Sequence, residues 1–498
     1  MRWCSVAALA PAVAGCSLIY NPNNLPDPRM IDAAIADVNP AMPVVVDFAP
    51  DSIDEGQGEG GSVPALLVVH GQNFVNSNLH LTLTPPQGVT VNVETVGPPT
   101  VSVGGDFAVF QLVAHVDGNL TARVPLDVTV TQDVSPQYGG GTATSAPPAK
   151  KFALNGLPEL TGSGSTTIDT ATLAKKYSQV KLESVTFNGT AAAIVRSVSF
   201  LQITMVLAKG TGSSAGPGGV SGGGSKGGGP GGGDPGTPAQ VLGGGGGGGG
   251  AGYTANGTAG QGPGGLGGAT GGAGGPHYGD DLIASLMANQ PSAGGAGGAG
   301  FLAGSEPGGH GGGGGGIVVL SAGGDLTVTG TITADGGKGD DGAGGGGGGA
   351  GGTVIVSSDA GKFSVTGAIS IKAGPPGSPL GGAGSVGRAR WDAIAGTAPV
   401  SPDRAAHRGP AFKIPTPVVQ TQPQTLTLLG THNDGFSIRV TDQTGAIHDG
   451  GRNSIGLDDT APIAPTLYPG YNRICITLDT GTQGDVESDK CTEVAYLP

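Results

Sequence analysis

The chain has 498 residues and a formal net charge of −14, and only 12% of its residues are charged. A protein that binds nucleic acid needs a basic surface, so this composition excludes that class of partner. There are 102 glycines. Glycine adds no side chain to a core and loses more backbone entropy on folding than any other residue, so segments dominated by it do not readily build a catalytic pocket. The composition favours an extended structural or surface protein.

The first 16 residues have the features of an export signal. Arg2 supplies a positive charge, residues 3–13 are mostly apolar, and Val13-Ala14-Gly15-Cys16 follows. This arrangement resembles the lipobox of bacterial lipoproteins, in which the cysteine is acylated and becomes the mature N-terminus. The resemblance implies lipidation at Cys16. An ordinary secretory signal, cut near the same place, is the alternative.

The residue after the cysteine is Ser17. In the lipoprotein family an Asp at this position is associated with retention in the inner membrane, so the resemblance implies the outer membrane or cell surface of a Gram-negative bacterium. Each buried lipid CH₂ contributes about 0.8 kcal/mol, so several acyl chains would hold the protein firmly to the membrane. Residues 17–42 are rich in Pro, Asn and Asp and are expected to form a tether.

Residues 43–133 alternate apolar and polar side chains, as Leu126, Val128 and Val130 illustrate. Alternation with a period of two predicts strands with one buried face, and about 90 such residues predict a β-sandwich. The segments 43–50 and 66–74, the second ending in Gly71-Gln72-Asn73-Phe74, resemble the IPT/TIG immunoglobulin-like module. Residues 134–160 contain glycine and proline clusters and are expected to be a linker.

Residues 161–400 contain an internal repeat. Residues 316–337 align with 353–374 at a constant offset of 37. The identical pairs are Val319/Val356, Ser321/Ser358, Gly324/Gly361, Val328/Val365, Thr329/Thr366, Gly330/Gly367, Ile332/Ile369 and Gly337/Gly374. A weaker copy at residues 200–208 places Val206 over Ile332. Such repeats cannot bury an apolar face alone, so they predict a stacked parallel β-helix or solenoid. A pair of ordinary hairpins is the alternative.

Glycine tracts at residues 243–250, 311–316 and 344–349 are expected to be insertions from this repeat domain. Two states are open to them: closely packed polyproline-II-like helices joined by backbone hydrogen bonds, or disordered loops. The unit at residues 327–337 resembles that of glycine-rich cell-surface proteins of predatory and related Gram-negative bacteria. More loosely, the tracts resemble the glycine-rich regions of phage tail-tip adhesins and of anaplastic-lymphoma-type receptor kinases.

Residues 413–498 return to alternation and predict a second sandwich, whose 467–472 segment resembles bacterial Ig-like domains. The chain has four cysteines: Cys4 lies in the signal and Cys16 would be acylated. Cys475 and Cys491 remain as a natural pair, and an exported setting permits a disulfide between them. Two free thiols are the alternative.

No catalytic constellation, cofactor motif or metal-ligand set is found. Two Gly-x-Ser-x-Gly matches, at residues 212–216 and 219–223, are expected by chance in so glycine-rich a chain, and no βαβ context surrounds a dinucleotide motif. The acidic pairs at 280–281 and 340–341 offer too few oxygens for calcium, and His277 and His310 are expected to be solvated. Lys338, Asp340, Arg388 and Arg390 are weighed as a polysaccharide-binding face or, preferably, as solvated turn charges.

The leading functional hypothesis is a non-enzymatic surface lipoprotein that acts as an elongated scaffold or adhesin. Its partners would be the membrane, through the lipid, and a surface polysaccharide or protein ligand. The second hypothesis is a carbohydrate-binding or carbohydrate-active β-helix protein that depends on Arg388 or Asp341. The third is binding of ice or another ordered surface. One fold serves all three, so architecture does not choose between them.

Overall fold

The computed structural model describes residues 42–75, 78–117, 120, 122–134, 140–240, 244–264, 268–283, 286, 290–292, 294, 307–479 and 489–498. Strands dominate, and this part of the chain contains no α-helix. None of its helical segments is long and apolar enough to cross a membrane. The sequence predicts two β-sandwiches and a β-helix or solenoid between them, and the all-β class of this prediction is confirmed. The signal segment with Cys16, and the tether up to residue 41, lie outside the described residues.

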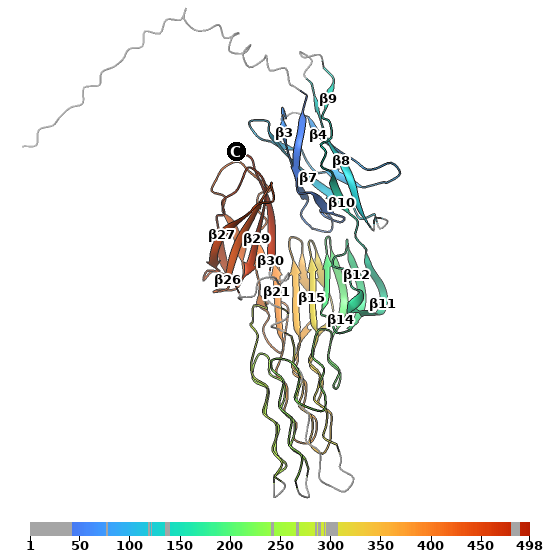
Figure 1. Ribbon diagram of the computed structural model, residues 1–498, viewed down its shortest axis with the longest axis vertical. Coiled ribbons are helices and arrows are strands. Elements are labelled where there is room, and N and C mark those ends of the chain that lie inside the picture. The colour runs from blue at the N-terminus through green and yellow to red at the C-terminus, as the bar shows by residue number, and fades with distance from the viewer. Residues whose placement is uncertain are drawn as a thin grey trace, which may run out of the picture.

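The N-terminal unit, residues 42–155, contains two sheets that share one core (Figure 1). The first sheet consists of β1 (Val44–Ala49), β3 (Ala65–Gln72), β7 (Phe107–Ala114), β5 (Val93–Thr95) and β6 (Thr100–Val101). The second consists of β2 (Ser52–Asp54), β10 (Phe152–Asn155), β8 (Arg123–Asp133), β4 (Leu79–Thr84) and β9 (Thr142–Thr144). All neighbouring strands are antiparallel except β2 and β10.

The core of this unit follows the alternation of the sequence. Leu126, Val128 and Val130 of β8 are fully buried, and their neighbours along the strand are more exposed. Phe48 and Phe152 meet edge to face with ring centroids 6.0 Å apart. Residues 134–160, expected to be a linker, contain β9 and β10, and both pair with β8. Glycine and proline clusters around β9 and β10 lower the local preference for strand, so neither strand is apparent from the sequence. Both form because they pair with β8, and such tertiary pairing outweighs local preference.

The parallel unit, residues 160–408, contains two sheets whose paired strands all run in the same direction (Figure 1). One sheet consists of β11 (Leu160–Asp169), β12 (Val180–Asn188), β14 (Leu201–Leu207), β16 (Leu326–Val328), β17 (Ile332–Thr333), β19 (Phe363–Val365) and β20 (Ile369–Ser370). The other consists of β13 (Ala193–Ser197), β15 (Ile317–Ala322), β18 (Thr353–Ser358), β21 (Arg388–Ala393) and β22 (His407–Arg408). A 3₁₀ turn at Thr170–Thr172 joins β11 to the segment before β12.

The repeat sets the register of the first parallel sheet. Val328 pairs with Val365 and Ile332 with Ile369, both at the predicted offset of 37. Val206 pairs with Ile332, as the weaker copy indicated. Val328, Ile332 and Ile369 are fully buried, and Val365 is half-buried against the same core. The predicted stacking of these residues is confirmed.

The predicted register of the second parallel sheet is wrong by one residue. Val319 pairs with Ile355 and Ser321 with Ser357, an offset of 36, and not with Val356 and Ser358. A slip of one residue exchanges the two faces of a strand, and alternation normally prevents it. Here both faces of β15 and β18 are apolar or buried, because Ile283 and Leu286 cover the outer face. Neither strand therefore shows the alternation of apolar and polar residues from which the register could have been predicted.

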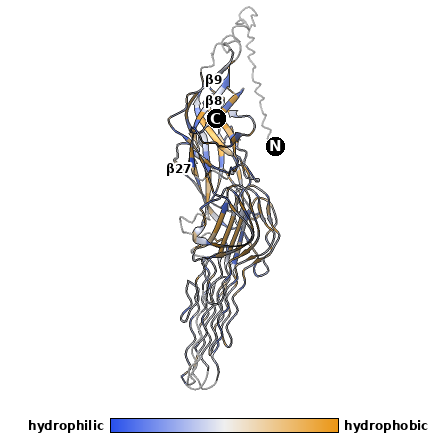
Figure 2. Ribbon diagram, turned by 90° about the vertical axis from the view of Figure 1, so that its right-hand side faces the viewer, coloured by the Kyte–Doolittle hydropathy of each residue, from blue (hydrophilic) through white to orange (hydrophobic). Residues whose placement is uncertain are grey.

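The glycine tracts lie on insertions between the two parallel sheets. The chain leaves β14, β17 and β20 of one sheet and returns at β15, β18 and β21 of the other, so the insertions emerge at the same end (Figure 1). We call the described residues of 210–316, 334–352 and 371–387 the glycine bundle. It projects away from the rest of the molecule, whereas the strongly hydrophobic residues gather in the strands above it (Figure 2).

The C-terminal unit, residues 411–498, again has two sheets around one core. One consists of β23 (Ala411–Phe412), β25 (Leu426–Leu429) and β28 (Thr460–Ile463). The other consists of β24 (Val418–Val419), β30 (Asp489–Tyr496), β29 (Gly470–Leu478), β26 (Gly435–Asp442) and β27 (Ile447–Ser454). Cys475 of β29 and Cys491 of β30 face each other across the strands in a disulfide with an S–S distance of 2.08 Å, as predicted.

The N-terminal and C-terminal units pack against each other directly. Leu66, Val68 and Phe107 on the outer face of β3 and β7 form a buried cluster with Tyr471 and Leu497 of the C-terminal unit. Both units also adjoin the parallel unit (Figure 1). The three units therefore meet in one junction.

Candidate functional site

The glycine bundle is held together by backbone hydrogen bonds with a period of three residues. In the central segment, residues 244–253, Gly246 and Gly249 donate to the carbonyls of Thr237 and Asp234. The residues that follow them, Gly247 and Gly250, donate to the carbonyls of Gln261 and Thr258 in a second segment. A period of three, without hydrogen bonds inside the segment, is that of the polyproline II helix.

The third residue of each triplet joins the central segment to a different insertion. Gly248 donates to Gly345 and Ala251 to Gly348, each at 2.9–3.0 Å. Gly382 donates in turn to the carbonyl of Gly248. All three insertions are thus cross-linked through one segment. Of the two states open to these glycine tracts, the packed one is observed.

Glycine is required at these positions because neighbouring backbones occupy the space of a side chain. A Cβ on Gly247 would lie 1.8 Å from the carbonyl oxygen of Leu380, and one on Gly250 would lie 1.9 Å from that of Ala383. Real Cβ atoms do not approach within 3.0 Å of another heavy atom. Gly223, in contrast, has no atom within 4 Å of its Cβ position. The close packing is local to the interior of the bundle.

Arg388 fastens the bundle to the second parallel sheet. Its side chain is 2% exposed, and Nη2 donates to the carbonyl of Tyr278 at 2.8 Å. The guanidinium lies 4.8 Å from the centre of the Tyr253 ring, and the Tyr253 hydroxyl hydrogen-bonds Thr353 of β18. Burial raises the pKa of Tyr253 well above its usual range and raises that of Tyr278 to about 12. Both phenols are therefore neutral at physiological pH.

Arg390 is also buried, at 1% exposure. It forms a two-pronged ion pair with Asp392, with both N–O distances 3.0 Å, and donates to the carbonyls of Leu282 and Ile283. The interpretation of Arg388 and Arg390 as solvated turn charges is wrong, because both side chains are buried. The alternative, a polysaccharide-binding face, stays a prediction. The period-two spacing of Arg388, Arg390 and Asp392 on one strand was the available signal, because alternate residues share a face.

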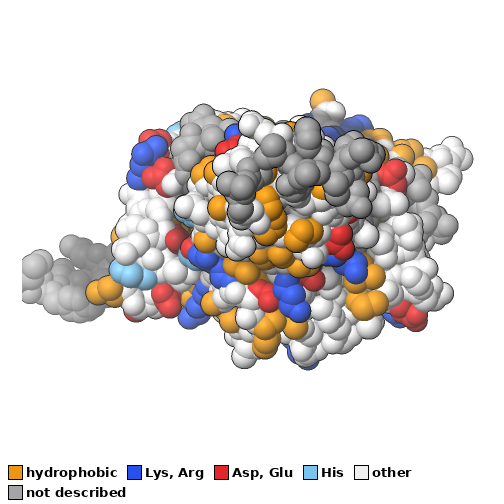
Figure 3. Space-filling view, turned by 90° about the horizontal axis from the view of Figure 1, so that it is seen from below, with side chains coloured by type: hydrophobic (Ala, Val, Ile, Leu, Met, Phe, Trp, Pro, Cys, Tyr) orange, Lys and Arg blue, Asp and Glu red, His pale blue; other side chains and the backbone are white. Residues whose placement is uncertain are grey.

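The other charged groups of the bundle lie at its surface. Lys338 pairs with Asp341 at 3.0 Å, Lys226 with Asp234 at 2.9 Å, and His310 lies 3.8 Å from Asp340. His277 and His310 are exposed, as expected. Seen from below, the described surface carries acidic and basic side chains in scattered small groups (Figure 3). No cluster of three metal-ligating side chains occurs among the described residues.

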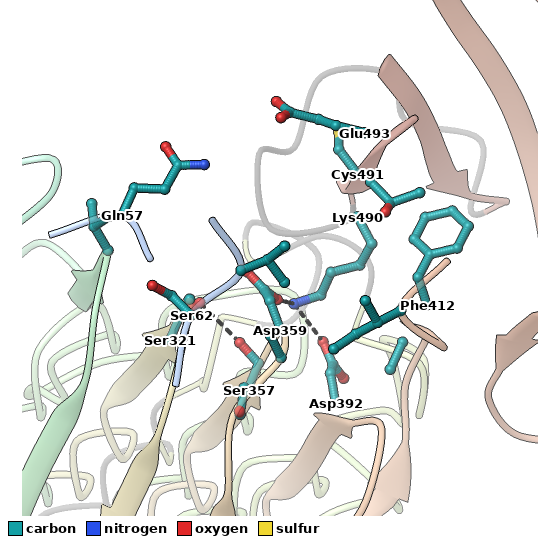
Figure 4. A pocket seen from close by; sticks show the side chains of 18 of the residues that line it. Gln57, Ser62, Ser321, Ser357, Asp359, Asp392, Phe412, Lys490, Cys491 and Glu493 are labelled. Atoms are coloured by element: carbon teal, nitrogen blue, oxygen red, sulfur yellow. Dashed lines mark hydrogen bonds and ion pairs between the residues drawn. The ribbon is translucent and has the colours of Figure 1, made fainter. Parts of the chain in front are cut away.

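A cleft of about 600 Å³ lies where the three units meet. We call it the junction cleft. Its wall from the N-terminal unit includes Gln57, Ser62, Pro64, Leu66 and Gln111. Its floor is the outer face of the second parallel sheet, and the C-terminal unit closes it with Phe412, Ile414, Arg473, Lys490 and Glu493. Figure 4 shows these walls around a common space.

Lys490 joins the C-terminal unit to the floor of the cleft (Figure 4). Its ammonium lies 3.3 Å from Asp359 and 3.4 Å from Asp392, and the side chain is 15% exposed. Burial lowers the pKa of Lys490, but the two carboxylates outweigh it and the net shift is upward. This lysine is therefore a fixed cation. No local sequence pattern identifies this lysine, because Asp359 and Asp392 lie far from it in the chain.

Glu493 lines the same cleft, but its surroundings disfavour its charged form, whereas those of Lys490 favour the charged form. It accepts a hydrogen bond from the Tyr471 hydroxyl at 2.7 Å. Burial is the main cause that raises the pKa of this carboxyl above its ordinary value. Arg473 faces Glu493 from the neighbouring strand.

No protein-family model, no curated protein and no solved structure matches this chain.

Proposed function

We propose that this protein is a non-enzymatic surface lipoprotein of a Gram-negative bacterium that acts as an elongated scaffold or adhesin and presents the glycine bundle. The observation that supports it most directly is the order of the bundle. Backbone hydrogen bonds join three insertions into one projecting body, with glycines that leave no space for a side chain. A rigid projection of this kind suits presentation of a surface rather than catalysis.

In this proposal the parallel unit is a β-helix. The chain passes alternately through the two parallel sheets, from β13 to β14, β15, β16, β17 and β18, and each pass stacks on the one before. Stacked coils bury a continuous core that no single repeat could bury. The N-terminal and C-terminal units would be immunoglobulin-like sandwiches, an assignment supported by their paired sheets around one core.

The lipid anchor is tested at Cys16. Cells that express the chain are grown with a fatty-acid probe, and the wild type is compared with Cys16→Ala. The proposal predicts that the label and the membrane fraction are lost in the variant. Equal labelling of both proteins would remove the anchor from the account.

Surface presentation is tested separately. Lys226 and Lys338 lie in the bundle with 66% and 51% of their side chains exposed. An amine reagent that does not cross membranes should modify both on intact cells. Modification only after lysis would contradict surface exposure. The adhesin and scaffold roles are then separated by measuring the adherence of cells that display Gly247→Val at the wild-type surface level. Adherence should fall if the bundle is an adhesin and stay unchanged if it is a structural scaffold.

A further inference from the structure

The junction cleft has a charge opposite to that of the chain as a whole. The basic residues that line it are Lys176, Arg196, Arg390, Arg473 and Lys490. The acidic ones are Asp54, Asp359, Asp392 and Glu493. Five basic groups thus face four acidic ones, in a chain with a net charge of −14. Burial also raises the pKa of Glu493 above its ordinary value.

Most of these charges are already engaged with each other. Lys176 pairs with Asp54 at 2.6 Å, Arg390 with Asp392, and Lys490 bridges Asp359 and Asp392. Arg473 lies opposite Glu493 on the neighbouring strand and acts on it electrostatically, but its side chain is exposed and its guanidinium donates no hydrogen bond to the described residues. A guanidinium in a cleft is suited to binding a carboxylate through two parallel hydrogen bonds. The cleft therefore has a cation available for an anionic ligand.

The floor of the cleft presents a row of polar side chains. Arg196, Ser321, Ser357 and Asp392 occupy one register position on four adjacent strands. Strands lie about 4.8 Å apart, so the row is about 14 Å long. Ser357 donates to the Ser321 hydroxyl at 2.9 Å, which leaves the Ser321 hydrogen available to a ligand. The side-chain amides of Gln57 and Gln111, on the opposite wall, make no hydrogen bond to the described residues.

The floor is the face of a sheet rather than its edge. β15 and β18 each have a hydrogen-bonded neighbour on both sides, so no extended peptide can add as a further strand there. Recognition has to use the side chains: a guanidinium, hydroxyls and amides, beside apolar residues such as Pro64 and Phe412. A volume of about 600 Å³ lies within the range of small-molecule sites.

We propose that the junction cleft binds a hydroxylated carboxylate, namely a uronic acid unit of an acidic saccharide. Arg473 binds the carboxylate, and Ser321, Gln57 and Gln111 bind hydroxyl groups. The walls come from three units, so binding also ties these units together. The inference depends neither on the lipid anchor nor on the glycine bundle.

The test is isothermal titration calorimetry on the purified Cys16→Ala chain with trigalacturonate as the probe. The neutral galactose trisaccharide is the matched ligand control. We expect the neutral ligand, and the Arg473→Gln variant with the acidic ligand, each to bind at least about tenfold more weakly. Arg452→Gln changes an exposed arginine of β27 that does not line the cleft, and it should bind like the wild type. Gln57→Ala should weaken binding of the acidic ligand without changing its preference over the neutral one.

Three results would overturn the inference. They are no heat of binding with trigalacturonate, equal affinity for the neutral trisaccharide, and unchanged affinity in Arg473→Gln. Tighter binding of a glutamate oligopeptide than of trigalacturonate would also overturn it, in favour of an acidic peptide. Thermal unfolding midpoints that match the wild type show that each variant is folded. The assay uses no membrane, so its failure leaves the test of lipid attachment unaffected.

Discussion

The amide of Gly248 donates a hydrogen bond of 2.9 Å to the carbonyl of Gly345, and this bond joins two insertions that are separated by strands of the parallel unit. Such bonds hold the bundle, because glycine has no side chain that could. Each one contributes only about 0.5–1.5 kcal/mol, so the order of the bundle depends on many of them together.

Side chains added inside the bundle should disrupt it. Gly247→Ala and Gly250→Ala place a methyl group within 2 Å of a carbonyl oxygen, and we expect each to destabilise the bundle by about 1–3 kcal/mol. Gly223→Ala is the control, since its Cβ meets no atom within 4 Å and its φ is not in the left-handed region. Thermal unfolding followed by circular dichroism measures the difference. Equal midpoints for all three variants would contradict the packing described.

Loss of Arg388 should release the bundle from the sheet. Arg388→Gln removes a buried guanidinium that donates to the bundle backbone, and we expect a loss of about 3 kcal/mol of unfolding free energy. Arg404→Gln is a matched control, because Arg404 also pairs with Asp281 but is 35% exposed. Exposed pairs contribute at most about 1 kcal/mol. Urea unfolding of both variants checks the contrast, and similar losses would argue against this role of Arg388.

The disulfide should stabilise the C-terminal unit. Cys475 and Cys491 are separated by 16 residues in sequence, and closing such a loop contributes about 3 kcal/mol in the chain-entropy model. The unfolding midpoint should fall when a reductant is added. The double variant Cys475→Ala/Cys491→Ala should show no response to reductant. A wild type that is equally indifferent would mean that the two cysteines are not bonded in solution.

Stability should decrease in acid through Asp442. Burial opposes ionisation of its carboxyl, but hydrogen bonds from His448, Thr444 and Ala446 outweigh burial and lower its pKa to about 2. A carboxyl whose pKa is lowered by folding contributes stability above its unfolded pKa of about 3.8 and loses it as the pH falls towards 2. Asp442→Asn should therefore lower the unfolding free energy at pH 7 and show a smaller decrease between pH 4 and 2. Parallel pH curves for both proteins would contradict this assignment.

The sequence predicted the strands whose two faces differ. β8 alternates buried and exposed residues and was readily identified, and the repeat predicted the pairing of Ile332 with Ile369. Where both faces are covered, as in β15 and β18, the alignment was one residue out of register. Both strands lie within the predicted repeat, so the lack of alternation affected their register and not their identification.

The candidate sites were less accessible to prediction. The state of the glycine tracts depends on contacts such as Gly247 with Leu380, between segments more than a hundred residues apart. The junction cleft gathers Gln57, Ser357 and Lys490 from three units, and no local motif connects them. The pairing of Cys475 with Cys491 was predictable because the sequence places Cys4 in the signal segment and Cys16 at the expected lipidation site, which leaves only these two cysteines.

The most direct test of the account is amide hydrogen exchange in residues 244–253, measured by NMR on the purified chain. The account predicts slow exchange at Gly248, Gly249, Gly250 and Ala251, each of which donates to another segment of the bundle, and faster exchange throughout this segment in Gly247→Ala. Exchange of these amides in the wild type at the rate of an unstructured glycine peptide would contradict the ordered bundle on which the proposed function depends.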